Sequence, residues 1–333
     1  MRIAIVVTLG PASASPAAVA ALRDAGADAV RLNGSHLDAE GLRRFVTWAA
    51  QGGFESARIV LDLQGGKTRI DGLGPPAEVD EGRDVLLMSA SRTGPRRPEL
   101  VLPVDRPEFV EALEPGDTVR VDDGRVGLQI IESTGTTVRA RVLGAGQISD
   151  RKGLALVGRE VGLPPRLLDA DRKLIQVALE LGIGTLAVSY AAVPGILPAT
   201  REAAVPGGGA VAPALVAKLE QPEALDRIGD ILANSDGVWL CRGDLGAEVG
   251  LAALPSLQRR LLGATLGRAT VLVAGQVLHH MTVSPRPTRS EACHVGDLVA
   301  QGVAGFVLSD ETATGPHGPE AVRALRRIAD DGR

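Results

Sequence analysis

Short apolar segments alternate with amphipathic stretches along most of this chain, and this alternation restricts the possible folds more than any other feature. Eight segments have the character of buried strands, at residues 3–8, 28–33, 58–62, 185–190, 214–220, 237–242, 270–274 and 305–309. Helix-like stretches follow most of them, at residues 16–25, 39–51, 169–181, 222–234, 254–266, 290–300 and 319–330. Alternating strands and helices predict a parallel sheet. Eight such units favour a closed TIM (β/α)8 barrel over an open doubly wound sheet.

Residues 68–162 interrupt this alternation. They lack the helical period and contain strand-like runs at residues 85–88, 99–102, 118–121, 126–131 and 138–142. The pair Asp123-Gly124 is a hairpin turn signal. Without this stretch the chain is close to the length of about 250 residues that is typical of a barrel. We therefore predict a barrel formed by residues 1–67 and 163–333, with an all-β lid domain at 68–162 inserted after the third strand.

Composition and charge exclude several classes of protein. The formal net charge is −4 and no block of like charges occurs, so binding to nucleic acid is not expected. No apolar run approaches the roughly 18 residues of a membrane span. The run at residues 3–9 could be read as a minimal signal peptide, but Gly10-Pro11 directly after it favours a strand. Cys241 and Cys293 stand apart in the sequence, which suits a reducing compartment and predicts a cytoplasmic protein.

Charged and polar side chains gather where the predicted strands end. They are Arg31, Asn33 and Ser35 after the second strand, Asp62 after the third, Lys218 and Glu220 after the fifth, and Arg242 and Asp244 after the sixth. Residues two apart share one face of a strand, and the active sites of barrels lie at the carboxyl ends of their strands. Cations and carboxylates that converge on one rim indicate an anionic ligand, phosphorylated or carboxylate, together with a divalent metal.

Glu220 and Asp244 are the candidate metal ligands. They offer hard oxygen atoms without His or Cys nearby in the sequence, which favours Mg²⁺ or Mn²⁺ over zinc. The spacing alone leaves open the alternative that both carboxylates form salt bridges, with Lys218 and Arg242 as their partners. The histidines at 279, 280, 294 and 317 show no metal-binding spacing and are interpreted as surface or packing residues.

Six motifs in a fixed order resemble those of the pyruvate kinase family. They are TLGPAS at 8–13, AVRLNGSH at 29–36, KLE at 218–220, RGDLG at 242–246, PRPTR at 285–289 and LSDETA at 308–313. The resemblance spans nearly the whole chain and implies a TIM barrel with a small β lid after strand three. It also implies phosphoryl transfer from phosphoenolpyruvate to ADP, a reaction of glycolysis, with Mg²⁺ or Mn²⁺. It is also compatible with a homo-oligomer formed through the barrel.

The resemblance also assigns roles to individual residues. Glu220 and Asp244 match the Mg²⁺ ligands, and Lys218 and Arg31 match the cations beside the transferred phosphoryl group. The backbone amides of Gly243 and Asp244 match the groups that hold the substrate carboxylate. The nucleotide-side positions are His36, Arg69 and Lys152, and the monovalent-cation positions are Asn33, Ser35 and Asp62.

The cation site resembles a potassium-independent subgroup of the family. Leu63, Gln64, Lys67 and Ile70 match that subgroup, in which a lysine ammonium replaces the ion. Lys67 is therefore expected to supply a catalytic positive charge, and K⁺ is not expected to be required. Either cation adds one positive charge beside the developing charge of the phosphoryl group.

Two features depart from the family pattern. Gly275 stands where the family has a threonine that contacts the substrate carboxylate and takes part in proton delivery, so the hydroxyl is missing and space opens. The chain also ends after the eighth helix, where the family continues into a C-terminal domain. The leading hypothesis is a pyruvate-kinase-like phosphotransferase.

The alternative is a Mg²⁺-dependent lyase, decarboxylase or aldolase that acts through a pyruvate-type enolate on a larger 2-oxo acid, using the space at Gly275. Retention of Lys152 and Arg69 favours the kinase, because a lyase needs no nucleotide. A non-catalytic binding protein is the third reading, and the many intact charged positions disfavour it.

Overall fold

The computed structural model describes residues 2–332 except 92–98, 123, 160–165 and 206–210. Its contacts divide the chain into two compact units. The first comprises Met1–Gly66, Pro165–Gly243 and Leu257–Arg333, and the second comprises Lys67–Pro164 and Asp244–Ser256. The sequence-based division assigns 244–256 to the barrel, whereas by contacts this segment groups with the insertion. The predicted boundary at 163 lies outside the described residues.

Eight parallel strands of the first unit close into a barrel in the order β1-β16-β15-β14-β13-β12-β3-β2. They are β1 (Ala4–Thr8), β2 (Ala29–Asn33), β3 (Ile59–Asp62), β12 (Thr185–Val188), β13 (Ala214–Leu219), β14 (Gly237–Cys241), β15 (Val271–Ala274) and β16 (Gly305–Leu308). Each of the eight predicted apolar segments contains one of these strands. The predicted TIM barrel is confirmed.

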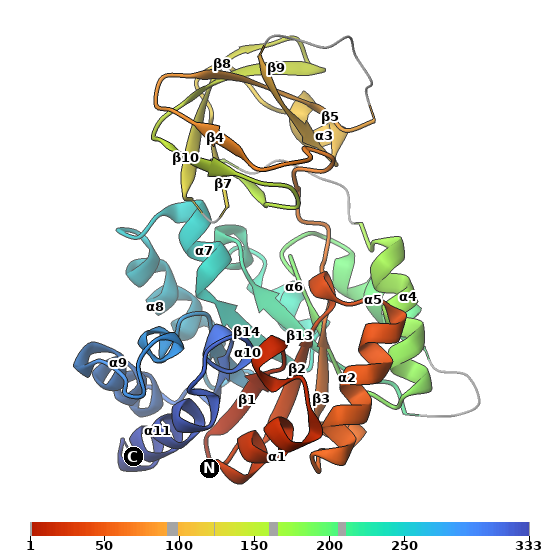
Figure 1. Cartoon of the computed structure of the whole chain (residues 1–333), viewed down its shortest axis with the longest axis vertical. Helices are drawn as coiled ribbons and strands as arrows, with labels where there is room; N and C mark the ends of the chain where they lie inside the picture. Colours follow the sequence, from red (N-terminus) through yellow and green to blue (C-terminus); the bar gives the residue numbers. More distant parts are fainter. Residues whose placement is uncertain (1, 92–98, 123, 160–165, 206–210, 333) are drawn as a thin grey trace. The chain divides into compact units, whose positions relative to one another are not determined.

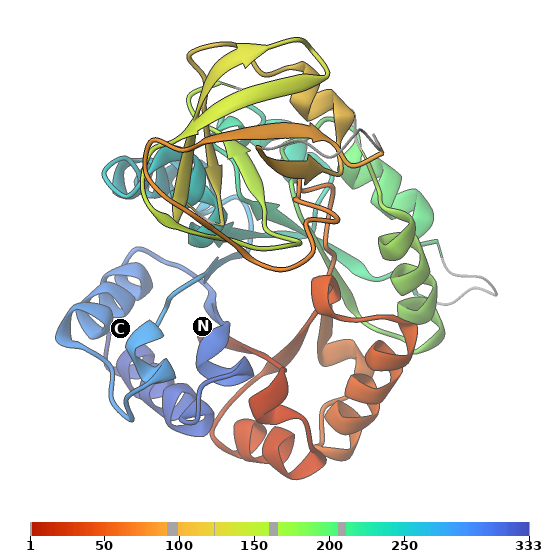
Figure 2. The same ribbon diagram turned by 45° about the horizontal axis from the view of Figure 1, so that its top comes forward.

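Helices follow the strands in sequence. They are α1 (Pro16–Asp24), α2 (Ala39–Gln51), α4 (Asp169–Glu180), α5 (Ile196–Ala203), α6 (Ile228–Ala233), α7 (Arg242–Val249), α8 (Leu254–Thr265), α9 (Arg289–Ala300), α10 (Asp310–Ala313) and α11 (Gly318–Asp331). Within the first unit α1 packs against α2 and α9 against α11, so the helices surround the central strands (Figure 2). The predicted helix at 222–234 forms only partly, because a 3₁₀ turn at Pro222–Ala224 precedes α6.

The barrel interior is filled by alternate residues of its strands. Val6, Val60, Ala187, Trp239, Leu272 and Val307 belong to one buried cluster. Because side chains alternate between the two faces of a strand, the inward-facing residue two positions further along lies closer to the carboxyl end. On β13 this position is Lys218, which follows the partly buried Val216 of the same cluster. The fold therefore places a lysine directly above an apolar core.

The second unit contains the inserted strands. They are β4 (Ala77–Val79), β5 (Asp84–Ser89), β6 (Leu100–Val104), β7 (Thr118–Val121), β8 (Val126–Ser133), β9 (Thr137–Val142), β10 (Gly146–Ile148) and β11 (Leu154–Leu156), with the short helix α3 (Pro107–Glu111). They form a six-stranded sheet in the order β11-β7-β8-β9-β5-β6 and a two-stranded sheet β10-β4 (Figure 1). All five predicted strand segments of the insertion coincide with strands of the larger sheet. Of the predicted hairpin pair, Asp123 lies outside the described residues and Gly124 has φ +90°.

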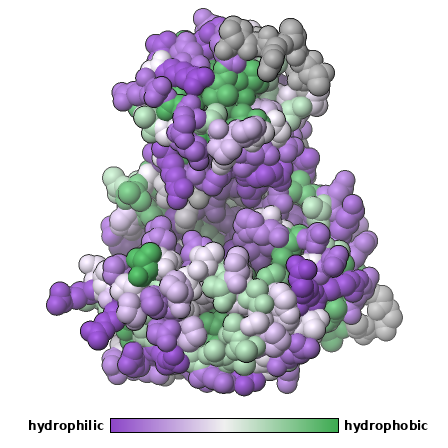
Figure 3. Space-filling model, viewed as in Figure 1, coloured by the Kyte–Doolittle hydropathy of each residue, from purple (hydrophilic) through white to green (hydrophobic). Residues whose placement is uncertain are grey.

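The face of the molecule shown in Figure 3 is mostly hydrophilic, with hydrophobic residues gathered only in small separate patches. Within the described ranges, no helix combines the length and the apolar character needed to cross a bilayer.

Candidate active site

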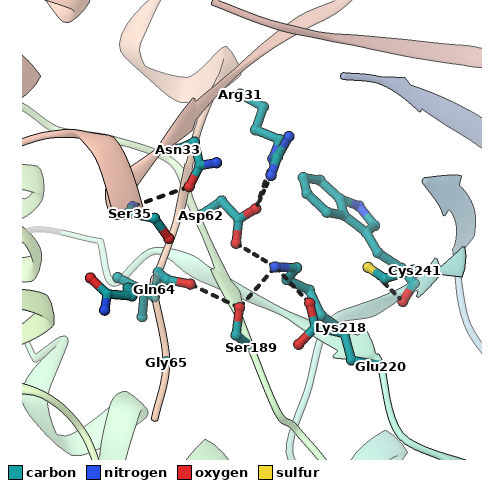
Figure 4. Close-up of polar contacts among 12 residues, drawn as sticks. Arg31, Asn33, Ser35, Asp62, Gln64, Gly65, Ser189, Lys218, Glu220 and Cys241 are labelled. Carbon is teal, nitrogen blue, oxygen red and sulfur yellow. Dashed lines mark hydrogen bonds and ion pairs between the residues drawn. The ribbon is translucent and has the colours of Figure 1, made fainter. Parts of the chain in front are cut away.

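The ammonium group of Lys218 lies at the carboxyl end of the barrel and is held by three side chains. Its Nζ is 2.9 Å from Oδ1 of Asp62 and 2.8 Å from Oε1 of Glu220, and it donates a hydrogen bond of 2.8 Å to Oγ of Ser189 (Figure 4). Ser189 in turn donates to the carbonyl of Leu63 at 2.8 Å. Asp62 and Glu220 are each only 2% exposed, so this ion pairing takes place away from bulk water.

A second cation shares the Asp62 carboxylate. Arg31 donates from Nε to Oδ2 of Asp62 at 2.7 Å, and its Nη2 lies 2.6 Å from the same oxygen. Its Nη1 donates to the hydroxyl of Thr8 at 3.0 Å. Because β2 and β3 pair in register, with Arg31 beside Val60 and Asn33 beside Asp62, the guanidinium and the carboxylate emerge from neighbouring strands. Two cations and two carboxylates thus form one buried network.

Both cations of this network remain charged at neutral pH. Burial alone would lower the pKa of Lys218, but the carboxylates of Asp62 and Glu220 outweigh it and the pKa is raised. Burial likewise opposes the charge of Arg31, while its ion pair and hydrogen bonds with Asp62 raise its pKa. A group whose pKa is raised in this way is a poor proton donor, so the network supplies fixed positive charge.

A second group of polar residues lies at the end of β2 and just after β2 and β3. Asn33 caps the short 3₁₀ helix Gly34–His36 by accepting a hydrogen bond of 3.1 Å from the Ser35 N–H. The loop after β3 is fixed by Asp171, a buried residue in the first turn of α4 that accepts from the N–H groups of Gln64 and Gly65, both at 2.9 Å. Figure 4 shows Asn33, Ser35 and Gln64 close to Asp62.

The two candidate metal ligands have different surroundings. Glu220 accepts from Lys218 through Oε1 and from the Tyr190 N–H at 2.8 Å through Oε2. Asp244 lies in the first turn of α7 and forms an ion pair with Lys67. Of the two alternative salt bridges, Glu220–Lys218 is present, whereas the partner of Asp244 is Lys67 and not Arg242. Among the described residues no group of three or more His, Cys, Asp or Glu side chains has a metal-binding arrangement.

Arg242 binds the loop that follows β15. It donates to the carbonyl of Gly275 from Nε at 2.9 Å and from Nη2 at 2.6 Å, and Nη2 also donates to the carbonyl of Gln276 at 2.9 Å. Its Nη1 is 2.7 Å from Nε2 of His294 on α9. Burial lowers the pKa of Arg242 to about 10, against the opposing charge of Glu311.

Comparisons with known proteins identify the family of the chain. The family model described as "Pyruvate kinase, barrel domain" matches residues 1–322. The chain is 36% identical over 331 residues to a pyruvate kinase of Agrobacterium vitis, covering 98% of this chain and 68% of that protein. It is 35% identical over 334 residues to a pyruvate kinase of Methylorubrum extorquens, covering 99% and 68%. A crystal structure of a pyruvate kinase from Cryptosporidium parvum matches with a TM-score of 0.87 at 26% identity, covering 99% of this chain and 69% of that one. The chain belongs to the pyruvate kinase family.

Membership of the pyruvate kinase family makes this a kinase-like enzyme and confirms the sequence-based identification. Several of the predicted site residues come together in the first unit. They are Arg31, Asp62, Lys218 and Glu220, with Asn33 and Ser35 beside them. In the second unit Lys67 pairs with Asp244, while its predicted role as a substitute for a monovalent cation stays a prediction.

Two of the predicted nucleotide-side residues of this pyruvate kinase family member also lie close together. Arg69 and Gly153 form an antiparallel bridge, and the Ile70 N–H donates to the Lys152 carbonyl at 2.9 Å. Arg69 donates from Nη1 to the Arg151 carbonyl at 2.8 Å, and Lys152 pairs with Asp122 at 2.9 Å. The third predicted residue, His36, ends the 3₁₀ helix after β2 in the other unit.

Sequence reasoning missed four contributors to the site. Thr8, Ser189 and the Tyr190 N–H all lie at or just after strand ends, so the rule that located Lys218 could have found them. His294 was interpreted as a surface or packing residue, and its contact with Arg242 has no sequence signal because 52 positions separate them.

Proposed function

We propose that this chain catalyses phosphoryl transfer between phosphoenolpyruvate and ADP, giving pyruvate and ATP, with Mg²⁺ or Mn²⁺ as the cofactor. The single observation that carries the proposal is the buried Arg31–Asp62–Lys218–Glu220 network in a chain of this family. It combines two permanent cations with two carboxylates at the carboxyl end of a barrel, where barrel enzymes have their active sites.

The role of Lys218 and Arg31 is electrostatic. Phosphoryl transfer depends mainly on positioning and on stabilising charge that spreads over the phosphoryl oxygens. Donors that are fixed before the reaction need no reorganisation, and such preorganised charge is a large part of catalysis. Asp62 contacts both cations, so in this proposal it orients them.

In this proposal Glu220 and Asp244 would supply oxygen ligands to a hard divalent cation. Each carboxylate oxygen can accept more than one interaction, so the contacts of Glu220 with Lys218 and Tyr190 do not by themselves prevent it from binding a metal ion. Mg²⁺ is commonly bound by one or two carboxylates plus substrate oxygens and water, and this donor set matches that pattern. When bound, the ion would supply Lewis acidity toward the substrate oxygens. The Asp244 carboxylate would then interact with the metal ion as well as with the ammonium of Lys67.

The remaining residues complete the substrate site in this proposal. The N–H groups of Gly243 and Asp244, in the first turn of α7, would receive the substrate carboxylate, since a helix N-terminus favours negative charge. His36, Arg69 and Lys152 would contact the nucleotide phosphates. Lys67 would add the positive charge that makes K⁺ unnecessary.

A coupled assay tests the proposal directly. Phosphoenolpyruvate, ADP and Mg²⁺ should yield ATP at a rate that is the same with and without K⁺. The Lys218→Met variant should reduce this rate by a factor on the order of 10² to 10³, as expected for loss of one preorganised charge. Absence of ATP formation with the folded, metal-supplied protein would overturn the proposal.

A second candidate function rests on Gly275. Because this residue has no side chain, no Cβ atom stands within 3.1 Å of the Gly243 nitrogen, which favours a larger 2-oxo acid cleaved through a pyruvate-type enolate by a Mg²⁺-dependent lyase, decarboxylase or aldolase. Turnover of oxaloacetate or of a hydroxylated 2-oxo acid, together with silence toward phosphoenolpyruvate and ADP, would select this alternative.

A further inference from the structure

Two consecutive residues after β15 have left-handed backbone conformations. Gly275 has φ +89° and Gln276 has φ +52°. The first is accessible only to glycine without strain, and the second costs an L-residue roughly 1–2 kcal/mol. A turn of this kind persists only where its surroundings hold it.

The Arg242 guanidinium holds this turn. It donates three hydrogen bonds to the carbonyls of Gly275 and Gln276, between 2.6 and 2.9 Å, and contacts His294 at 2.7 Å. In the described part of the chain no carboxylate lies within ion-pair distance of Arg242. Its interactions are therefore those of a clamp on backbone carbonyls, anchored on α9 by the imidazole.

The turn has a direct neighbour in the candidate substrate site. A Cβ atom added to Gly275 would lie 3.1 Å from the Gly243 nitrogen and 3.5 Å from the Arg242 nitrogen. The glycine thus packs closely against the amide that the proposed function assigns to the substrate carboxylate. A shift of the turn by a fraction of an ångström would change the space over that N–H group.

We propose that Arg242 is a positioning residue: with His294 as its anchor, it holds Gly275 and Gln276 in the left-handed turn that leaves the Gly243 amide open to a substrate carboxylate. This inference rests on the substrate site of the proposed function but not on phosphoryl transfer itself. It applies equally to a kinase and to an enzyme that forms an enolate.

In this arrangement the guanidinium of Arg242 is the hydrogen-bond donor and the imidazole of His294 is the acceptor. Burial lowers the pKa of His294, and the charge of Arg242 lowers it further against the opposing effect of Asp297. The neutral ring can accept a hydrogen bond from Arg242 through Nε2. A glutamine at this position offers a carbonyl acceptor without titrating, whereas leucine offers none.

Oxalate binding in the presence of Mg²⁺ tests the proposal independently of turnover. Oxalate is a planar dicarboxylate that resembles the enolate of pyruvate, and its affinity can be measured by isothermal titration calorimetry. Arg242→Lys should weaken oxalate binding roughly 10- to 100-fold, because the single ammonium of a lysine cannot reproduce the rigid planar fork of donors that reaches both carbonyls and His294 together. Arg326→Lys is the matched control: Arg326 donates to the carbonyls of Ile3 and Gly26, which precede the first two strands, whereas the turn follows the carboxyl end of β15.

The outcomes separate the inference from the proposed function. Weaker oxalate binding by Arg242→Lys, with wild-type affinity in Arg326→Lys, supports the clamp even if no ATP is formed. Equal affinities in both variants overturn it, even if phosphoryl transfer occurs. If Arg242→Lys does not fold, His294→Leu should weaken oxalate binding and His294→Gln should retain it, and equal affinity in these two variants also overturns the proposal. A wild-type protein that binds no oxalate refutes the substrate site and the clamp together.

Discussion

Arg120 on strand β7 donates a hydrogen bond of 2.7 Å from Nη1 to the carbonyl of Ala247 in helix α7. Both residues belong to the second compact unit. The last carbonyls of a helix have no partner within the helix, and a cation near them also interacts favourably with the helix dipole. A Cβ atom on Gly250, just beyond the helix, would lie 3.0 Å from Nη2 of Arg120. One side chain of the insertion therefore holds the end of the helix that carries Asp244.

Removal of this side chain should loosen α7. We expect Arg120→Ala to reduce protection of the amides of residues 246–250 from hydrogen exchange, by the equivalent of about 1–2 kcal/mol in opening free energy. Arg125→Ala is the control, because the side chain of Arg125 is 79% exposed and pairs with Asp122, three positions earlier in the chain. Equal exchange in the two variants would show that Arg120 does not support the helix.

Substitution of Asp171 should affect the loop after β3 through two backbone donors. Burial raises the pKa of its carboxyl, while the hydrogen bonds from Gln64 and Gly65 partly oppose this. Asp171→Ala leaves both N–H groups without their acceptor. Each buried donor without a hydrogen-bond partner costs about 1–3 kcal/mol, so the substitution should lower the free energy of unfolding by about 2–4 kcal/mol. Urea unfolding at pH 7 measures the effect. Asp171→Asn keeps one acceptor oxygen and should fall between alanine and the wild type.

The stability contributed by Glu291 should depend on pH. Burial opposes the charge of this carboxylate, but hydrogen bonds from the His280 N–H, the Thr288 N–H and the Thr288 hydroxyl outweigh it and lower the pKa below its ordinary value. A lowered pKa means that the stabilisation is present above the unfolded-state value of 4.5 and is lost as the pH falls through the folded-state value.

The capping box at the start of α9 provides the test of this pH dependence. Glu291→Gln should lower the unfolding free energy by about 1 kcal/mol at pH 7, and the difference from the wild type should shrink as the pH falls below 4.5. Thr288→Ala removes the hydroxyl that accepts a hydrogen bond from the Glu291 N–H. Neither of these two groups titrates in this pH range, so part of the loss in unfolding free energy should persist at low pH. A Glu291→Gln effect that stays constant down to pH 3 would contradict the assignment.

The barrel strands were predictable because each is a short apolar run that ends in polar residues. This pattern arises when parallel strands are buried on both faces and only their ends meet solvent or ligand. The positions of Arg31, Asp62, Lys218 and Glu220 follow from the same rule. Their mutual contacts agree with the prediction that cations and carboxylates converge on one rim.

The same rule failed at Arg242 for a physical reason. The prediction placed Arg242 and Asp244 on one face of a strand, but β14 ends at Cys241 and both residues lie in the first turn of α7. Successive residues in a helix are about 100° apart, so positions two apart point in different directions. Arg242 therefore reaches the β15 loop, while Asp244 pairs with Lys67, a residue 177 positions away that no local pattern could indicate.

Replacement of Gly275 by threonine should reduce function rather than restore it. The resemblance to the family suggests that threonine would return a hydroxyl to the site, and a gain in phosphoryl transfer would be the expected result on that basis. The structure predicts the opposite, because φ at this position is +89° and a Cβ atom would lie 3.1 Å from the Gly243 nitrogen. A β-branched side chain is especially unfavourable in this conformation.

Alanine variants separate backbone strain from obstruction of the site. Gly302 has φ +97° with nothing within 4 Å of an added Cβ atom, so Gly302→Ala and Gly275→Ala should each lose roughly 1–2 kcal/mol of stability from the left-handed conformation. Only Gly275→Ala places a methyl group against the Gly243 amide, so it alone should also weaken oxalate binding. If Gly275→Thr instead increases ATP formation, the loop must adopt another conformation in the active enzyme, and the glycine would then have no role in keeping the amide open.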